Sequence, residues 1–421
     1  MRRAPLSLIV PLLASLGAPL VAQSTNYTVP GALGRPLVDR EEAVERAVEQ
    51  ARWRWGGLRV DPWLALRKLA WVEERDLDGG TTSDLTATAG AGLDLYLPFG
   101  PKSTLAAEIR PEYVWWRDDA DRSRLAGRYA LGGFVFSNRL TLELVARSND
   151  SDGIVTPELD RRVESLEQRL DADLEVRVWR RIALFARGSV ASVEVGGDEP
   201  VPGLDVLDRD EDWWVGGVRL KLGDDVSVGV GAGRSQATFD SAGDARDTDG
   251  DTLYGDLRWI RPKLQVSLEL FDTELVAASG SAFPGFDDLL WTGRVRWMPR
   301  EAYSFAVYGQ SSLAWSLGAT APYYVDERWG TEVGFRAGER LGLRAFWEQG
   351  DNTYAPAADG SRRVDDTSSY GAGLDLRLLR SLTLELEARR TEVDSPLAGA
   401  DREFSEIRAG LRFGGGSSSV F

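Results

Sequence analysis

Residues 166–178 alternate between apolar and charged side chains, and this alternation is the feature that most limits how the chain can fold. The stretch reads LEQRLDADLEVRV, with Leu166, Leu170 and Leu174 on one parity and charged residues from Glu167 to Arg177 on the other. A period of two belongs to a β-strand, because the same positions in a helix would point to all sides. The apolar face of such a strand meets a core in a soluble sandwich, or lipid in an outer-membrane barrel whose charged face lines a wet lumen.

Similar alternation recurs from about residue 57 to residue 413, in about eighteen segments that are mostly about 9 to 13 residues long. Other clear examples are STLAAEIRPEYVWW at 103–116, LGLRAFWEQ at 341–349 and LTLELEARR at 382–390. This length matches a tilted strand that crosses a bilayer. We therefore predict about eighteen strands, with sixteen as the alternative, because residues 54–74 break the alternation and fit either one bulged strand or two.

The connections between these segments alternate in length. Longer links rich in Asp, such as 196–212, 240–251 and 350–366, separate short turns, which with the exception of 179–181 carry Gly, Pro, Asn, Asp or Ser. The short turns are 99–102, 137–139, 179–181, 223–225, 261–263, 299–301, 338–340 and 379–381. Short periplasmic turns and long external loops are typical of a transmembrane antiparallel β-barrel, whereas a soluble sandwich has no need of this regularity. An even number of strands then places both chain ends in the periplasm.

The N-terminal sequence predicts export. Arg2 and Arg3 precede an apolar stretch at 6–16, and Leu20-Val21-Ala22 is a plausible cleavage site of a signal peptide. A membrane anchor is the alternative, but prolines at 5, 11 and 19 disfavour it. No later apolar run is long enough for a spanning helix. We therefore expect the outer membrane of a Gram-negative-type bacterium.

Composition excludes several functions. The chain has no His, which removes His bases, His metal ligands and Ser-His triads. It has no Cys, so an exported chain of this kind has no disulfide framework. The net charge of −16 disfavours binding to nucleic acid.

One helix is expected before the barrel, within residues 39–53. Val44, Ala47 and Ala51 recur at helical spacing, and Asp39 with Glu42 has the spacing of a capping box. The helix lies either in the periplasm, which we favour, or folded into the barrel mouth. The predicted division is a signal peptide at 1–22, a periplasmic N-terminal segment at 23–53, the barrel at 54–415 and a C-terminal tail at 416–421.

Aromatic residues cluster near the ends of the segments, as in the two interfacial belts of a membrane barrel. The predicted belt beside the short turns contains Trp179, Trp259, Trp297 and Tyr303. The predicted belt toward the long loops contains Trp115, Trp116, Trp214, Trp315 and Trp347.

Charged residues on the inward parity are predicted to line the pore. They are Glu108, Arg110, Glu112, Glu143, Arg147, Asp171, Asp173, Glu175, Arg177, Arg187, Arg219, Arg258, Arg294, Arg296, Glu332, Arg336, Arg344, Glu348, Arg377, Glu385, Glu387 and Arg389. Opposed cations and anions either create a transverse field that helps polar solutes pass, or brace the wall as salt bridges. Small inward residues, Ser227, Gly229, Gly231, Gly233, Gly371 and Gly373, predict room for an inward-folded loop.

Two sets of carboxylates resemble chemical sites. Carboxylate pairs such as Asp171 with Asp173, or Glu385 with Glu387, lie about 7 Å apart on one strand face, a separation of the kind that glycosidases use. A lining of mixed charge explains them better. Asp244, Asp247, Asp249 and Asp251 suit Ca²⁺, but a solvated acidic loop is the better explanation. We therefore predict no catalytic residue, no metal site and no cofactor.

The stretch GLDLYLPFGPKSTLAAEIRPEYVWW at 92–116 resembles a hairpin of outer-membrane β-barrel porins that are often encoded beside exopolysaccharide genes. In both, a strand enters a PFG-type turn and returns with alternating residues and then aromatics. The resemblance in pattern covers about 57–413 and brings no catalytic or ligand residue. It implies a porin-like barrel that serves polysaccharide secretion.

The predicted function is passage of hydrophilic solutes, by diffusion or as the outer-membrane exit for a saccharide. The alternative is a non-conducting structural or adhesive barrel, and an open lumen would separate the two. Expected partners are outer-membrane lipid, lipopolysaccharide, the barrel-assembly machinery and a polysaccharide, with no nucleic acid. The sequence shows no interface that would fix an oligomeric state.

Overall fold

The fold was obtained as a computed structural model of the whole chain. Described are residues 29–34, 39–75, 81–159, 161–196, 203–223, 225–240, 246–278, 283–318, 321–338, 340–357, 360–379, 381–397, 400–414 and 420–421. The predicted signal peptide and Asp244 lie outside these residues. Among the described residues, no helix is long and apolar enough to cross a membrane.

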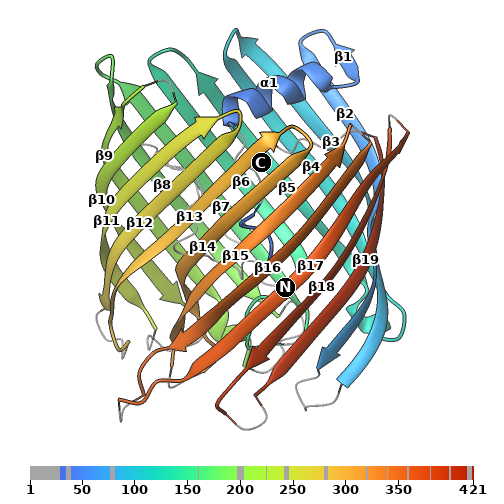
Figure 1. Cartoon of the computed structure of the whole chain (residues 1–421), viewed down its shortest axis with the longest axis vertical. Helices are drawn as coiled ribbons and strands as arrows, with labels where there is room; N and C mark the ends of the chain where they lie inside the picture. Colours follow the sequence, from blue (N-terminus) through green and yellow to red (C-terminus); the bar gives the residue numbers. More distant parts are fainter. Residues whose placement is uncertain are drawn as a thin grey trace, which may run out of the picture.

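Eighteen antiparallel strands form a closed barrel, as predicted (Figure 1). The strands are β2 (Leu58–Arg75), β3 (Thr81–Gly100), β4 (Ser103–Trp116), β5 (Arg124–Phe136), β6 (Leu140–Gly153), β7 (Val163–Arg177), β8 (Ile182–Val195), β9 (Arg209–Lys221), β10 (Val226–Phe239), β11 (Thr248–Arg261), β12 (Leu264–Ala277), β13 (Phe286–Arg300), β14 (Tyr303–Trp315), β15 (Tyr323–Ala337), β16 (Leu341–Tyr354), β17 (Val364–Leu379), β18 (Leu382–Asp394) and β19 (Arg402–Gly414). A further short strand, β1 (Trp53–Trp55), pairs only with the start of β2.

Closure depends on the pairing of the last strand with the first strand of the barrel. β19 runs antiparallel to β2, from Ser405 opposite Glu73 to Gly414 opposite Trp63, with an irregularity between Ala409 and Leu411. Every other barrel strand pairs with its neighbours in sequence. The sheet therefore has no open edge, which a structure surrounded by lipid requires because unpaired backbone groups would have no water.

The alternation of short and long connections is confirmed. The predicted short turns all join consecutive strands at one end of the barrel, and the longer connections join strands at the other end. Two longer connections contain 3-10 turns, Ala120–Arg122 and Asp205–Leu207. Along β7 the parity also holds, since Leu170 is exposed while Asp171 is buried inside the barrel.

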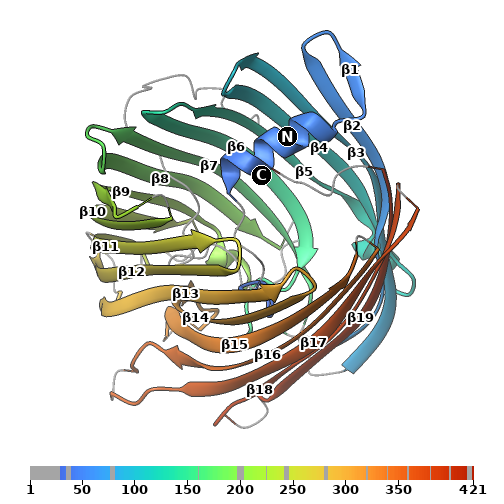
Figure 2. The same cartoon turned by 45° about the horizontal axis from the view of Figure 1, so that its top comes forward.

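Helix α1 (Arg40–Gln50) lies inside the short-turn mouth, not free in the periplasm as we favoured. The Oδ1 atom of Asp39 accepts a hydrogen bond from the backbone N–H of Glu42 at 3.1 Å, which caps the helix. The apolar face of the helix packs on inward residues of β3–β6, with the C-terminal Val420 beside them. Figure 2 shows the helix lying across these strands. The reason for this position is that the wall offers an apolar surface, Tyr96, Ala106, Phe134, Phe136 and Val145, to the face formed by Val44, Ala47 and Ala51.

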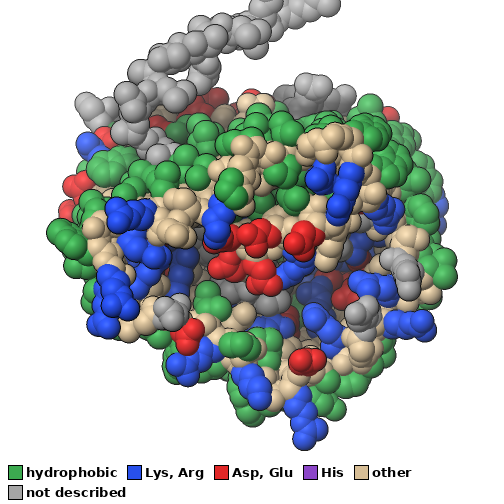
Figure 3. Space-filling model, turned by 90° about the horizontal axis from the view of Figure 1, so that it is seen from above, with side chains coloured by type: hydrophobic (Ala, Val, Ile, Leu, Met, Phe, Trp, Pro, Cys, Tyr) green, Lys and Arg blue, Asp and Glu red, His purple; other side chains and the backbone are tan. Residues whose placement is uncertain are grey.

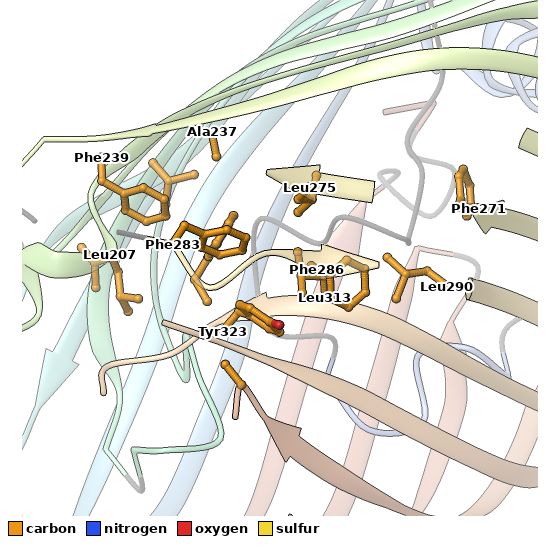
Figure 4. Packing of buried hydrophobic residues seen from close by; sticks show 14 of the residues in the cluster. Leu207, Ala237, Phe239, Phe271, Leu275, Phe283, Phe286, Leu290, Leu313 and Tyr323 are labelled. Atoms are coloured by element: carbon orange, nitrogen blue, oxygen red, sulfur yellow. The ribbon is translucent and has the colours of Figure 1, made fainter. Parts of the chain in front are cut away.

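An apolar cluster fills part of the barrel interior toward the long connections (Figure 4). It joins inward residues of β8–β15, such as Phe271 and Leu290, to loop residues such as Leu207 and Phe283. Trp315 belongs to this cluster and is buried, as is Trp116 in a smaller cluster on β2–β5. These two residues therefore do not belong to the lipid-facing belt that we predicted. Trp116 stands on the inward parity of β4. Trp315 shares the parity of the exposed Phe305 and Val307, but its indole lies inside the barrel, where Nε1 donates a hydrogen bond to Glu211 at 3.0 Å.

Candidate functional site: a charged cavity in the barrel

A cavity of about 1530 Å³ runs inside the barrel along β2–β6 and β13–β19. At the short-turn end it reaches Arg46 of α1 and the turn residues Glu301 and Arg340. At the other end it meets the connection between β6 and β7, including Leu159. The barrel interior thus has two sides. On the filled side, the apolar cluster of β8–β15 occupies the interior. On the cavity side, along β2–β6 and β13–β19, there is space for water and small solutes.

Of the 52 described residues that line this cavity, 22 are charged. The acidic members number nine: Glu112, Asp150, Asp152, Glu301, Glu332, Asp375, Glu385, Glu387 and Glu406. The basic members number thirteen: Arg46, Arg67, Lys68, Arg128, Arg162, Arg296, Arg336, Arg340, Arg344, Arg377, Arg389, Arg408 and Arg412. The described part of the lining is therefore net cationic, although the whole chain has a net charge of −16.

Ion pairs hold many of these groups in fixed positions on the wall. Glu387 on β18 pairs with Arg344 on β16 and with Arg408 on β19, the latter at 2.7 Å. Glu406 on β19 pairs with Lys68 on β2 at 3.2 Å and with Arg162 at 2.9 Å. Each of these two carboxylates therefore binds two or more cations that line the cavity. Such fixed cations suit hydrogen bonding to hydrophilic solutes.

The short-turn mouth has its own charge arrangement. Seen from this end, acidic side chains gather in the middle of the mouth and Lys and Arg lie around them (Figure 3). Helix α1 is part of this mouth, and its Glu41 pairs with Lys102 of the β3–β4 turn at 2.6 Å. Its Arg40 pairs with Glu143 of β6 at 3.3 Å and donates a hydrogen bond to the carbonyl of Val420 at 2.5 Å. These contacts hold the helix on the wall.

The predicted pore-lining residues divide into two groups. The first group lies on the cavity and consists of Glu112, Arg296, Glu332, Arg336, Arg344, Arg377, Glu385, Glu387 and Arg389. The second group is not on the cavity and consists of Glu108, Arg110, Glu143, Arg147, Asp171, Asp173, Glu175, Arg177, Arg187, Arg219, Arg258, Arg294 and Glu348. Most of the second group takes part in ion pairs within the wall, and Arg177 is exposed near the short turns.

On the filled side of the barrel, ion pairs brace the wall. Arg187 on β8 is 2% exposed and contacts Asp173 at 3.1 Å, and its Nη1 donates to the hydroxyl of Tyr254 at 2.9 Å. Arg219 on β9 binds Glu175 at 2.7 Å and Asp256 at 3.0 Å. Of the two roles predicted for inward charges, bracing by ion pairs describes this side of the barrel.

The inward glycines make room for side chains, not for the loop that we expected beside them. A Cβ at Gly229 would lie 1.9 Å from the carboxylate of Asp256, and one at Gly371 would lie 2.5 Å from the ring of Phe346. Gly231 in the same way faces the ring of Phe185. Small residues on one strand therefore accommodate large or charged residues on the next strands, which is close packing across the sheet.

The segment that does fold inward is the connection from 154 to 162, which sequence reasoning missed. Glu158 accepts hydrogen bonds from the Ser316 hydroxyl at 2.9 Å and from the Leu317 backbone N–H at 2.6 Å. Its carbonyl accepts a bond from Arg402 of β19 at 3.1 Å. The segment thus touches the β14–β15 connection and β19, and bounds the cavity. Its apolar residues Ile154, Val155 and Leu159 were the available signal, since an exposed loop has no use for them.

A second missed segment is PGALG at 30–34, which lies against the inner wall of β13–β16. Arg294 and Arg296 donate hydrogen bonds to the carbonyls of Leu33 and Gly34, at 2.9 and 2.6 Å. Two glycines beside a proline were the signal here, because such residues allow close approach of the backbone to a wall.

No metal-ligand or catalytic geometry stands out. Within the described ranges, no group of three or more Asp or Glu residues is placed to hold a metal ion. Asp247, one of the four Asp residues of the acidic loop, accepts a hydrogen bond from the Phe239 backbone N–H at 2.8 Å. Asp171 forms an ion pair with Arg147, and Asp173 forms one with Arg187. The two carboxylates therefore brace the barrel wall.

Comparison with known proteins identifies the fold. No protein-family model and no curated protein sequence matches the chain. Among solved structures, OpdK of Pseudomonas aeruginosa aligns with a TM-score of 0.50 and 10% identity, covering 85% of this chain and 98% of that one. The fold is that of an outer-membrane porin.

Two further structures agree with this assignment. A BenF-like porin from Pseudomonas fluorescens Pf-5 aligns with a TM-score of 0.50 and 11% identity, over 85% of this chain and 98% of that one. OpdL of Pseudomonas aeruginosa aligns with a TM-score of 0.50 and 12% identity, over 84% of this chain and 98% of that one. At these identities the porin barrel, and not its cargo, is what the proteins share.

Proposed function

We propose that this porin-fold protein is an outer-membrane channel for hydrophilic solutes. The observation that carries the proposal is the charged cavity of about 1530 Å³ within a barrel whose outer surface is apolar. Water and polar solutes find hydrogen-bonding partners there, whereas an apolar solute would have to displace the water that hydrates these ions. The channel contributes no covalent chemistry in this account, and the lining charges as a set carry the function.

The cargo follows from the balance of charge on the cavity. Thirteen basic against nine acidic side chains favour anionic solutes over cationic ones. The resemblance of residues 92–116 to porins encoded beside exopolysaccharide genes supports one such cargo, an acidic saccharide that leaves the cell. Arg344 and Arg408, which flank Glu387, are well placed to donate hydrogen bonds to its carboxylate and hydroxyl groups.

The proposed setting is the outer membrane of a Gram-negative-type bacterium, reached with a signal peptide at 1–22. The short turns and α1 then face the periplasm, and the longer connections face outward. In this setting the barrel contacts membrane lipid and lipopolysaccharide, and the barrel-assembly machinery inserts it. Nucleic acid is not among the proposed partners.

A non-conducting structural or adhesive barrel is the second candidate. The observations that favour it are the apolar cluster of β8–β15 and the inward segment 154–162, because both take space from the lumen. A barrel used only for adhesion would need no passage through its interior.

Solute flux into liposomes separates the two candidates. Proteoliposomes that contain the refolded chain are shifted into isotonic solutions of glucuronate, glucose or glucosamine, and swelling is followed by light scattering. The channel proposal expects swelling in all three, fastest with glucuronate, and none in protein-free liposomes. Absence of swelling with every solute would favour the structural barrel.

A further inference from the structure

Residues 29–34, which we call the strap, are bound to the inner wall of β13–β16 through their backbone. The Gly31 N–H donates to Oε1 of Glu348 at 2.7 Å. Arg294 and Arg296 donate to the Leu33 and Gly34 carbonyls, as described above. The wall thus offers one acceptor and two donors to a turn of main chain, in which the Ala32 N–H donates to the Val29 carbonyl at 3.1 Å.

The strap fits the wall closely at its two glycines. Gly31 has φ of +80°, and a Cβ there would lie 2.8 Å from the ring of Phe346. A Cβ on Gly34 would lie 2.8 Å from Cε1 of Tyr308 and 2.9 Å from Oε2 of Glu332. Both positions therefore require glycine for steric reasons, and Gly31 also requires it for its backbone conformation. The ring of Phe346, which contacts Gly31, also lies against Gly371 of β17.

The wall groups that hold the strap are buried. Glu348 is 2% exposed, Glu332 is 5% exposed and Arg296 is 8% exposed. Arg296 also binds Glu332 at 3.2 Å and donates to the Ser304 hydroxyl at 2.8 Å, which fixes its direction. Buried charged groups that are already oriented bind a backbone at low entropic cost.

The strap and α1 hold different walls of the barrel. The strap contacts β13–β16, whereas α1 packs on β3–β6, only a few residues further along the chain. Val29 and Pro30 of the strap line the cavity. The N-terminal segment therefore takes up space that a solute would otherwise use.

We propose that the recess formed by Arg294, Arg296, Tyr308, Glu332, Phe346 and Glu348 is a peptide-binding site inside the barrel, and that the strap is its resident, autoinhibitory ligand. The ligand class is a short peptide with glycines that presents one N–H and two carbonyls to the wall. The effect on flow rests on the proposed channel function, whereas the binding site itself does not.

The first test measures peptide binding without reference to transport. A chain that begins at residue 35 is refolded in detergent, and a fluorescent peptide of sequence VPGALG is titrated against it by anisotropy. We expect saturable binding to this chain, at least about tenfold weaker binding to the full chain whose site is occupied, and a similar loss for the peptide VPVALV. Equal anisotropy changes for both peptides, or equal binding to both chains, would overturn the proposal.

Wall variants identify the site in the same assay. Replacing Arg294 and Arg296 by Gln in the shortened chain is expected to weaken binding of VPGALG by about tenfold or more, because two hydrogen bonds to carbonyls are lost. The matched control is Arg344→Gln with Arg389→Gln, two arginines of the same cavity that pair with Glu387 and Glu406 on β18 and β19. Loss of binding in the control pair alone would contradict the assigned site.

The second test measures the effect on conductance. Gly31→Val with Gly34→Val, in the full chain, is expected to raise single-channel conductance by about twofold because the strap leaves the recess. Gly153→Val is the control, since Gly153 lines the same cavity and a Cβ there meets nothing within 4 Å. Conducting wild-type channels with unchanged conductance in the strap variant would overturn autoinhibition. Silence of all three chains together with peptide binding would support the site and contradict the channel function.

Discussion

Truncation of the Glu158 side chain should widen the cavity at the end of the barrel that carries the longer connections. Its half-buried carboxylate accepts bonds from Ser316 and Leu317, at 2.9 and 2.6 Å, and so holds the inward segment 154–162 against the β14–β15 connection. Alanine removes both bonds but keeps the bond from Arg402 to the backbone carbonyl of residue 158. The segment should therefore detach on one side only, and the barrel should still fold.

The size of this effect follows from the two bonds. A hydrogen bond to a charged group contributes about 1.5 to 3 kcal/mol, and the lower value applies because water reaches this end of the barrel. Glu158→Ala should therefore weaken docking of the segment by about 3 kcal/mol, which corresponds to about a 150-fold change in the ratio of docked to undocked forms.

Single-channel recording measures this ratio. We expect long dwells at one conductance level in the wild-type chain, and frequent visits to a higher level in Glu158→Ala, with the ratio of dwell times lowered by about two orders of magnitude. Glu327→Ala is the matched control, because Glu327 is exposed on β15 near the same end. If Glu158→Ala and Glu327→Ala give the same dwell-time ratio as the wild type, segment 154–162 does not constrict the channel.

Two further predictions concern charge and the helix. The double variant Arg344→Gln, Arg408→Gln removes two of the thirteen basic side chains on the cavity, which are also both cations that flank Glu387. The reversal potential in a KCl gradient should therefore move toward cation selectivity. An unchanged reversal potential would show that these residues do not face the ion path. Ala47→Asp places a carboxylate in the buried face of α1, where Ala47 is 3% exposed, and should cost several kcal/mol, about the penalty for an unpaired buried charge. The helix should then leave the wall, and trypsin should cut after Arg46. In the control variant Gln50→Asp, which changes an exposed residue, this bond should stay as protected from trypsin as it is in the wild type. Equal cleavage of the two variants would contradict the packing of α1.

The barrel could be predicted from the sequence because the alternation of apolar and polar residues along each strand indicates which face meets lipid and which faces the interior. Leu170 and Asp171 are adjacent, and their opposite character alone indicates lipid on one side and an interior on the other. The short turns are equally local, since Gly, Pro and Asn act within a few residues. For the same reason α1 was predicted from the spacing of its own apolar residues and from Asp39.

The contents of the barrel could not be predicted in the same way, because they depend on strands that are distant in sequence. Glycine is required at position 371 because a Cβ there would collide with the ring of Phe346 on the neighbouring strand. A Cβ at position 31 would collide with the same ring. Arg187 and Arg344 have the same parity and chemistry, yet one braces the filled side and the other lies on the cavity. Helix α1 was placed wrongly because its periodicity says nothing about the apolar wall at Phe134 and Phe136.

The most direct test of the account is conductance of the refolded wild-type chain in a planar bilayer under a KCl gradient. The account predicts stable single-channel steps, a reversal potential that reports preference for Cl⁻ over K⁺, and partial block by an oligosaccharide of uronic acids. A wild-type chain that is correctly inserted but silent, and that stays silent as Glu158→Ala and as the strap variant, would contradict the claim that the charged cavity is a passage.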